Sequence, residues 1–337
     1  GTATYLIPIV VPPGRAGLTP SLSLVYDSST RDGVVGRGWS LKGLSSITRC
    51  GSTYAQDGQA RGVRLSAKDN FCLDGKRLVP YAPGMTAPGK HYRTELESFS
   101  DIAAFGGSTA SYTGPDYFQV RTTAGQTMTY GRSVSARVTA RFDSPEDGVS
   151  SSDPVNVSWY LETIEDLNGN RIKIRYQSES REMCAACRNG ASYNYTINTR
   201  PATISYGDRG SHVIGVKYSS ALTYWGDVAF QGGVGKEFSR PVETITTSVD
   251  QKIVRVYKLS GEVKRSSWLV RKVEACTPNG SQLACLQPTT FDYLDLPTAL
   301  TKVVKTTDET GFIPTSHKRR LRRRQFHPEH WDAWSPT

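Results

Sequence analysis

Short runs of alternating or β-branched residues, each bounded by Gly, Pro, Asn or Asp, recur along the whole chain and constrain its fold more than any other feature. Such runs are typical of half-buried strands that end in turns. No window of apolar residues with a helical period reaches a convincing length. The composition agrees, because 31 Gly, 18 Pro and 17 Tyr stand against 3 Met. The sequence therefore predicts an all-β fold, with strands near 21–26, 117–122, 126–130, 155–165, 171–177, 213–218, 242–248, 252–259 and 268–276.

Two pairs of these runs are joined by turn sequences. Residues 155–165 and 171–177 flank Asp166-Leu-Asn-Gly-Asn170, whose Asn-Gly step supplies the positive φ angles of a tight hairpin. Residues 248–251 separate the runs 242–248 and 252–259 in the same way. We therefore expect extended hairpins that build antiparallel ladders.

The length of 337 residues allows roughly two domains of about 150 residues. Residues 80–89 and 143–154 are rich in Pro, Ser, Asp and Gly, and the second stretch is a soft candidate boundary. The longest apolar run, Tyr5 to Val11, contains Pro8 and is far shorter than the ~20 residues of a spanning helix. We expect no membrane span, and the start at Gly1 leads us to expect a processed or excised piece.

The formal net charge of +10 is concentrated at one end of the chain. In residues 317–337, six Lys and Arg stand against Glu329 and Asp332, so +4 of the +10 lies there. The basic run 318–324 is compatible with nucleic acid or anionic lipid, but no aromatic residues interleave with it, so specific nucleic-acid recognition is not expected. We predict that this tail is disordered, and its abrupt change of composition suggests that a frameshift replaced the normal continuation.

The six cysteines allow fifteen disulfide connectivities, of which pairing between sequence neighbours is one. Cys50 could pair with Cys72, and Cys276 with Cys285, which encloses a Pro-Asn-Gly turn suited to a disulfide-closed hairpin. Cys184 and Cys187 lie in a polar loop as Cys-Ala-Ala-Cys. This pair is compatible with a loop clasp or free thiols, with half of a zinc site, or with a redox motif.

The first fifty residues carry the most specific motif of the chain. The stretch 5–26 contains Pro12, Pro13, Gly14, Gly17, Pro20 and Tyr26, and it is followed by Gly36-Arg-Gly38-Trp39-Ser-Leu and by Ile47-Thr-Arg49. This N-terminal motif resembles the N-terminal SpvB/TcaC-type domain. The resemblance continues in the later stretches 71–79, 92–100, 114–120 and 166–171, the last of which includes Asp166, Gly169 and Asn170. That domain opens the B components of insecticidal toxin complexes and the Rhs/YD-repeat proteins. The resemblance covers residues 1–295, followed by a junction at 296–316 and the tail at 317–337.

The resemblance implies a structural module of a secreted or extracellular virulence protein, which could be cytoplasmic before export. The module would form part of a β-sheet shell that encapsulates a toxic cargo, and its implied partners are downstream shell or propeller segments, the cargo and a translocation component. No catalytic residue, cofactor or metal is implied, because the motif residues shape and pack: the turn glycines permit the close backbone path that lets Trp39 pack inward. We expect the fragment to leave an exposed, adhesive strand edge.

Other readings of the residues remain open. Glu95-Leu-Glu97 matches the Glu-x-Glu spelling of ADP-ribosyltransferases, although the upstream elements of that fold are missing. Asp166, Asn168 and Asn170 alternate as in calcium loops, but no Glu occupies the twelfth position. His327 and His330 lack the helical context of a zincin. A carbohydrate- or surface-binding module would instead expose an aromatic row that includes Tyr193, Tyr195, Tyr224 and Trp225.

Overall fold

The computed structural model describes residues 1–81, 90–107, 113–140, 155–183, 193–221, 225–231 and 234–293. The chain divides into a unit Gly1–Asp292 and a unit Tyr293–Thr337, and all the elements below belong to the first unit. Every paired strand in it is antiparallel, as the sequence predicts. No helix in the described part of the chain is long and apolar enough to cross a membrane. The candidate boundary at 143–154 and the tail from residue 317 lie outside the described residues.

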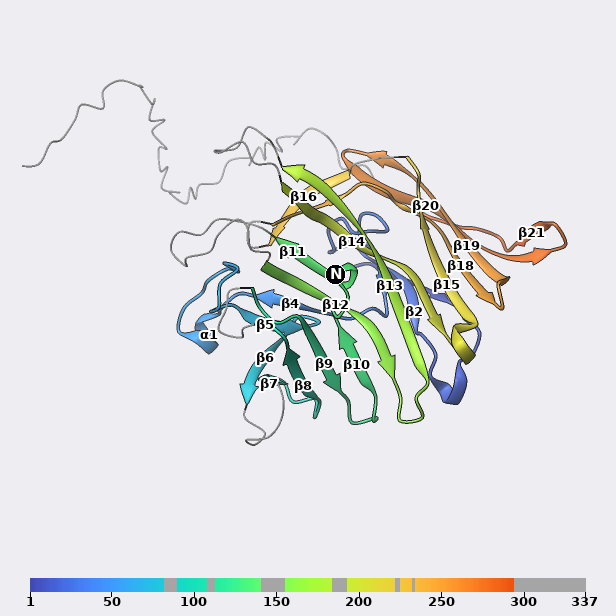
Figure 1. Cartoon of the computed structure of the whole chain (residues 1–337). Helices are drawn as coiled ribbons and strands as arrows, with labels where there is room; N and C mark the ends of the chain where they lie inside the picture. The colour runs from blue at the N-terminus through green and yellow to red at the C-terminus, as the bar shows by residue number, and fades with distance from the viewer. Residues whose placement is uncertain are drawn as a thin grey trace, which may run out of the picture. The chain divides into compact units, whose positions relative to one another are not determined.

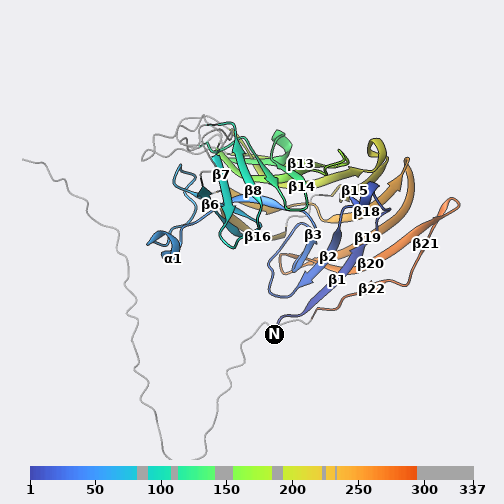
Figure 2. The same cartoon turned by 90° about the horizontal axis from the view of Figure 1, so that it is seen from below.

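A small sheet forms from the N-terminal motif. Its order is β1–β2–β3, and it consists of β1 (Thr4–Ile9), β2 (Leu22–Asp27) and β3 (Trp39–Lys42). A turn with a short 3-10 segment, Arg15–Gly17, joins the first two strands. Figure 2 shows this sheet as a layer beneath β13, β14, β15 and β18.

The middle of the chain closes into a barrel. Its ring runs through β4 (Ser46–Cys50), β5 (Asn70–Leu73), β6 (Lys76–Tyr81), β7 (Lys90–Thr94), β8 (Asp101–Phe105), β9 (Tyr117–Arg121), β10 (Thr127–Tyr130) and β12 (Val155–Glu165). Closure occurs on β12, which pairs with β10 near Glu165 and with β4 near Trp159. We call these eight strands, each paired with the next around the ring, the closed barrel. Two short helical segments and one strand flank them: α1 (Tyr54–Asp57), η2 (Val134–Ala136) and β11 (Arg137–Ala140).

The end of β12 also starts a second, open sheet, which we call the long sheet. It continues through β13 (Arg171–Met183), β14 (Tyr193–Tyr206), β15 (His212–Tyr218), β18 (Val242–Val249), β19 (Lys252–Lys264), β20 (Ser267–Asn279), β21 (Gln282–Cys285) and β22 (Thr289–Thr290). A 3-10 segment, Asp208–Gly210, precedes β15. Within the described ranges, β16 (Trp225–Gln231) and β17 (Val234–Phe238) form a separate two-stranded sheet. Figure 1 shows the β20–β21 hairpin extending away from the rest of this sheet.

Several long-sheet strands are longer than their sequence runs predict. The predicted strand 171–177 extends to Met183, and the predicted strand 252–259 extends to Lys264. Both extensions cross polar residues, and in both the backbone continues to pair with a neighbouring strand, β14 or β20. The length of these strands is therefore set by backbone pairing with the neighbouring strand. The local alternation of side chains does not predict that pairing.

One continuous core joins the N-terminal sheet, the closed barrel and the long sheet. Its fully buried members include Leu24 and Trp39 from the N-terminal sheet, Phe118 and Trp159 from the barrel, and Ile245 from the long sheet. Alternate residues along each strand supply these side chains, because successive residues point to opposite faces of a sheet. The three parts therefore stabilise one another through shared apolar burial.

Candidate functional site

The turn of the N-terminal motif fastens the small sheet to the long sheet. The Tyr206 hydroxyl donates a hydrogen bond of 2.6 Å to the carbonyl of Pro12, and the Val10 amide donates one of 2.8 Å to the Tyr257 hydroxyl. Inside the turn, the Gly14 amide donates to the Thr19 hydroxyl at 2.8 Å. Pro20 is buried, whereas Pro13 and Gly17 are exposed. The turn therefore presents backbone groups to tyrosines of the long sheet.

The segment before Trp39 depends on glycine for close approach. Gly38 has φ +74°, and a Cβ added there would lie 2.6 Å from the Tyr26 ring. Gly36, at φ +149°, would place a Cβ 2.8 Å from the carbonyl oxygen of Trp268 in β20. Both positions exclude a larger residue on steric grounds. The path they permit brings Trp39 into the core, where its ring lies 4.9 Å from that of Phe291.

Arg49 lies inside the closed barrel and ties distant segments together. Its guanidinium forms an ion pair of 3.2 Å with Asp69, and both side chains are almost fully buried. Its Nε donates to the carbonyl of Asn156 at 2.7 Å, and Nη1 donates to the carbonyl of Ser66 at 2.8 Å. Burial lowers the pKa of Arg49, and the charge of Asp69 opposes that change. This arrangement is typical of a structural anchor, because a buried cation is tolerated only when it is paired and hydrogen-bonded.

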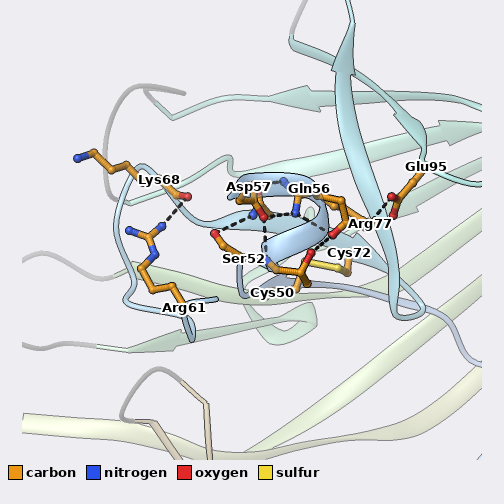
Figure 3. A network of polar contacts seen from close by, with 11 residues as sticks. Cys50, Ser52, Gln56, Asp57, Arg61, Lys68, Cys72, Arg77 and Glu95 are labelled. Atoms are coloured by element: carbon orange, nitrogen blue, oxygen red, sulfur yellow. Dashed lines mark hydrogen bonds and ion pairs between the residues drawn. A yellow bond between two sulfur atoms is a disulfide. The ribbon is translucent and has the colours of Figure 1, made fainter. Parts of the chain in front are cut away.

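A polar groove lies beside α1, and Figure 3 shows its contacts. Arg77 donates from both terminal nitrogens to Asp57, with each bond 2.6 Å long, and also to Asn70 at 3.0 Å. The Gln56 amide donates to Glu95 at 2.5 Å. The hydrogen bond from Arg77 is the main reason that the pKa of Asp57 falls to about 2. A cavity of about 480 Å³, lined partly by these residues and by the disulfide Cys50–Cys72, lies at this point.

This α1 groove was not predicted as a site. Arg77 and Glu95 lie within the motif stretches 71–79 and 92–100, but only the fold brings them to Asp57 and Gln56. The Glu-x-Glu pair of the enzymatic reading lies in the turn that follows β7. There Glu95 accepts from Gln56, and Glu97 lies 3.9 Å from Arg93 and accepts from the Phe99 amide at 2.7 Å. Both carboxylates thus hold local structure.

Asp166, Gly169 and Asn170 form the turn between β12 and β13. One Asp166 carboxylate oxygen accepts from the amides of Asn168 and Asn170, each at 2.9 Å, and the other accepts from the Asn170 side chain at 2.8 Å. The last of these bonds is the main cause that lowers the pKa of Asp166. Gly169 has φ +76°, as predicted, whereas Asn168 does not have a positive φ, so the Asn-Gly step supplies one such angle and not two. The Asp166 carboxylate, which the calcium-loop hypothesis would make a metal ligand, therefore accepts hydrogen bonds from Asn168 and Asn170 in its own turn.

The structure contains disulfides Cys50–Cys72, which joins β4 to β5, and Cys276–Cys285, which joins β20 to β21. The candidate metal and redox residues Cys184, Cys187, His327 and His330 lie outside the described residues, as does Tyr224 of the aromatic row. The same holds for the side chains of Tyr193, Tyr195 and Trp225. Within the described ranges, no group of three or more His, Cys, Asp or Glu could hold a metal ion.

The fold and these contacts define an all-antiparallel β module in which the motif residues join sheets to one another. A family model named SpvB, described as Salmonella virulence plasmid 65kDa B protein, matches residues 1–272. The chain belongs to this family. No curated protein sequence matches it.

Solved structures with the same fold include two kinds of protein. The N-terminal domain of effector protein SpvB from Salmonella typhimurium strain LT2 is 17% identical, with a TM-score of 0.61, and the match covers 81% of this chain and 99% of that one. The crystal structure of TcdB2-TccC3-TEV is 16% identical, with a TM-score of 0.66. A Photorhabdus luminescens Tc holotoxin pore carrying the mutation TccC3-D651A is 17% identical, with a TM-score of 0.61. In the last two, the match covers 88% of this chain but only 16% of the other chain.

Proposed function

We propose that the chain is a non-catalytic structural module of a toxin-complex-related virulence protein, and that it contributes to a β-sheet shell around a toxic cargo. The family membership and the shared fold with chains of toxin complexes support this role. Because the chain spans 16% of those larger chains, the shell would need further strands beyond it. Its proposed partners are these further shell or propeller segments, the cargo, and a translocation component.

One observation carries the proposal: the last edge of the long sheet is open and uncharged. In the strand registers of the described residues, β21 pairs with β20 alone. No charged side chain occurs between residues 277 and 291, although charged residues make up 21% of the chain. Leu283 and Leu286 are 38% and 69% exposed. Edge strands of soluble proteins are normally guarded by charges, Pro or bulges, and here only Pro288 interrupts the stretch that follows β21. An edge of this kind suits the addition of another strand.

A charge placed on this edge tests the proposal. Sedimentation velocity of the full chain should show concentration-dependent association through the open edge, and Leu286→Lys should abolish it, because the added ammonium makes the edge unsuitable for pairing. Val134→Lys is the matched control, since Val134 is 73% exposed on η2, away from this edge. A strictly monomeric wild type, or equal association of wild type and Leu286→Lys, would count against the shell module.

The finer features of this role are part of the proposal. Continuation into Rhs/YD-repeat or propeller segments, and the division into a domain 1–295, a junction 296–316 and a tail 317–337, remain predictions. We also infer secretion, because two disulfides are typical of proteins that work in oxidising compartments. The absence of catalysis is tested by incubating the full chain with NAD and a mixture of host proteins. Turnover of NAD that Glu95→Gln removes would contradict it.

A further inference from the structure

A small pocket opens into the closed barrel beside the Arg49–Asp69 pair. Its volume is about 170 Å³, and its wall includes Arg49, Asp69, Phe71, Lys90, Tyr92 and Pro115. An apolar cavity of about 150 Å³ accommodates a benzene-sized molecule, so this pocket has room for a molecule of similar size. It is separate from the open edge on which the shell proposal rests.

The Tyr92 hydroxyl is the distinctive group of this pocket. Tyr92 is only 3% exposed, and among the described residues its hydroxyl has no hydrogen-bond partner. The other buried tyrosines all have one: the hydroxyls of Tyr176, Tyr206 and Tyr218 donate to backbone carbonyls, that of Tyr257 accepts from Val10, and that of Tyr130 bonds to Ser45. The described side-chain atoms that are both fully buried and without a partner do not include this oxygen, so it is reachable from the pocket and free to donate to a bound ligand.

The wall around this hydroxyl is positive. Asp69 balances Arg49 through their ion pair, and its oxygens also accept from the amides of Ser66 and Arg64. Lys68 and Lys90 line the pocket as well, and no ion pair engages either of them within the described ranges. The Lys90 ammonium lies 5.8 Å from the centre of the Tyr92 ring. Burial raises the pKa of Tyr92 to about 12, so near neutral pH the phenol keeps its proton and can donate it in a hydrogen bond.

We propose that this pocket binds a small oxyanion, a carboxylate or a phosphate, with the Tyr92 hydroxyl as hydrogen-bond donor and Lys90 as the neighbouring cation. A phenol donor and an ammonium together match the acceptor-only oxygens and the negative charge of such a ligand. A neutral ligand would not balance the positive charge of Lys68 and Lys90. The size of the pocket restricts the ligand to a few heavy atoms around its charged group.

Isothermal titration calorimetry of the full chain tests this assignment. Inorganic phosphate and acetate are titrated separately, in chloride buffers of matched ionic strength, and at least one should bind with a saturable heat. Phosphate alone would identify a phosphoryl ligand, and acetate a carboxylate. Tyr92→Phe removes one oxygen without changing the ring, and it should weaken binding about tenfold, since a hydrogen bond to a charged group is lost. Lys90→Gln should weaken binding by about threefold or more, because it removes the nearby charge.

Two control variants separate the pocket from general effects. Tyr54→Phe removes an exposed hydroxyl on α1, and Lys252→Gln removes an exposed charge at the start of β19. Neither should change the affinity. Thermal unfolding of each variant verifies the fold, and Lys90→Gln provides the test if Tyr92→Phe fails to fold. The proposal is overturned if neither anion saturates, if glucose binds where both anions fail, or if the Tyr92 and Lys90 variants bind as well as wild type.

Discussion

The closed barrel and the long sheet are both built from antiparallel strand pairs, but the barrel has no edge strand, whereas the long sheet has one. Each strand of the barrel ring has a neighbour on both sides, because β12 pairs with both β10 and β4. The long sheet begins on the same strand and ends on β21 and β22, which pair with β20 and, in the strand registers of the described residues, with no further strand. Closure removes edges altogether, whereas an open sheet retains one that another strand can use.

The interiors of the two regions differ as well. The barrel encloses the buried Arg49–Asp69 ion pair and the Tyr92 hydroxyl beside a pocket. In the long sheet, the buried hydroxyls of Tyr206 and Tyr218 are satisfied by backbone carbonyls. Under the two proposals above, the barrel binds a small ligand and the long sheet accepts a further strand. Strand β12 belongs to both, so the sharpest tests of the comparison lie in and around it.

The largest effect is expected from Trp159→Ala. Trp159 is fully buried in β12, its ring lies 5.0 Å from that of Phe118, and its Nε1 donates to the carbonyl of Pro115 at 3.0 Å. Loss of its side chain should lower the free energy of unfolding by about 3–5 kcal/mol, measured by guanidinium denaturation. Ile245→Ala is the comparison in the long sheet and should cost about 2–5 kcal/mol. A loss below about 1 kcal/mol for Trp159→Ala would show that β12 does not join the two regions energetically.

A similar loss is expected when the buried ion pair is broken. Asp69→Ala leaves Arg49 charged and buried without its partner, which should cost about 3–5 kcal/mol of unfolding free energy. The double variant Arg49→Met with Asp69→Leu should recover much of this loss, because it removes both charges together. Chemical denaturation of the two variants and of wild type measures the difference. Equal stability of Asp69→Ala and wild type would indicate that water reaches this part of the barrel.

The two disulfides should contribute unequally. Cys50–Cys72 spans 22 positions inside the folded body, so its removal by Cys→Ser substitution at both positions should cost about 3 kcal/mol. Cys276–Cys285 spans 9 positions and closes a hairpin whose remaining residues are exposed, so its removal should cost only about 0–1 kcal/mol globally and mainly loosen the hairpin. Thermal unfolding and hydrogen exchange of both double variants measure this contrast. An equal global loss would refute it.

The smallest effect concerns pH and the α1 groove. The pKa of Asp57 is lowered from 3.8 to about 2, chiefly by the hydrogen bond from Arg77. A carboxyl with a depressed folded-state pKa stabilises the fold at pH values above its unfolded-state pKa, and this stabilisation is lost as the pH falls through the folded-state value. The melting temperature of wild type should therefore fall between about pH 4 and pH 2, and Asp57→Asn should remove part of that fall. Asp208→Asn, in an exposed ion pair with Arg15, is the control and should leave the profile unchanged. Parallel profiles of wild type and Asp57→Asn would contradict the assignment.

Much of the fold was accessible from local sequence. The strand 155–165 agrees with β12 at both ends, and the Asn-Gly step correctly predicts the hairpin that follows it. The second predicted hairpin also occurs, with Asp250 and Gln251 at positive φ between β18 and β19. These features depend on residues close together in the chain, where side-chain alternation and turn chemistry act directly.

The candidate sites were less accessible. The motif glycines and Trp39 could be recognised by their pattern, but the sequence does not show that Gly36 faces the backbone of β20. The groove of Asp57, Arg77 and Glu95 and the pocket beside Tyr92 were not predicted at all. The groove residues lie on α1, on β6 and in the turn after β7, and the pocket residues come from several strands and loops, so only the folded chain brings them together.

The sequence by itself determined the all-β class, the antiparallel hairpins and the uncharged stretch from 277 to 291, because these follow from side-chain periodicity, turn residues and charge. Only the tertiary structure decided that β12 serves two sheets, that one sheet closes while the other ends on that uncharged stretch, and that Tyr92 keeps a hydroxyl without a partner. The physical reason is that strand pairing and buried hydrogen bonds depend on groups far apart in the chain. The local pattern of residues specifies a strand, but it does not specify the neighbour of that strand.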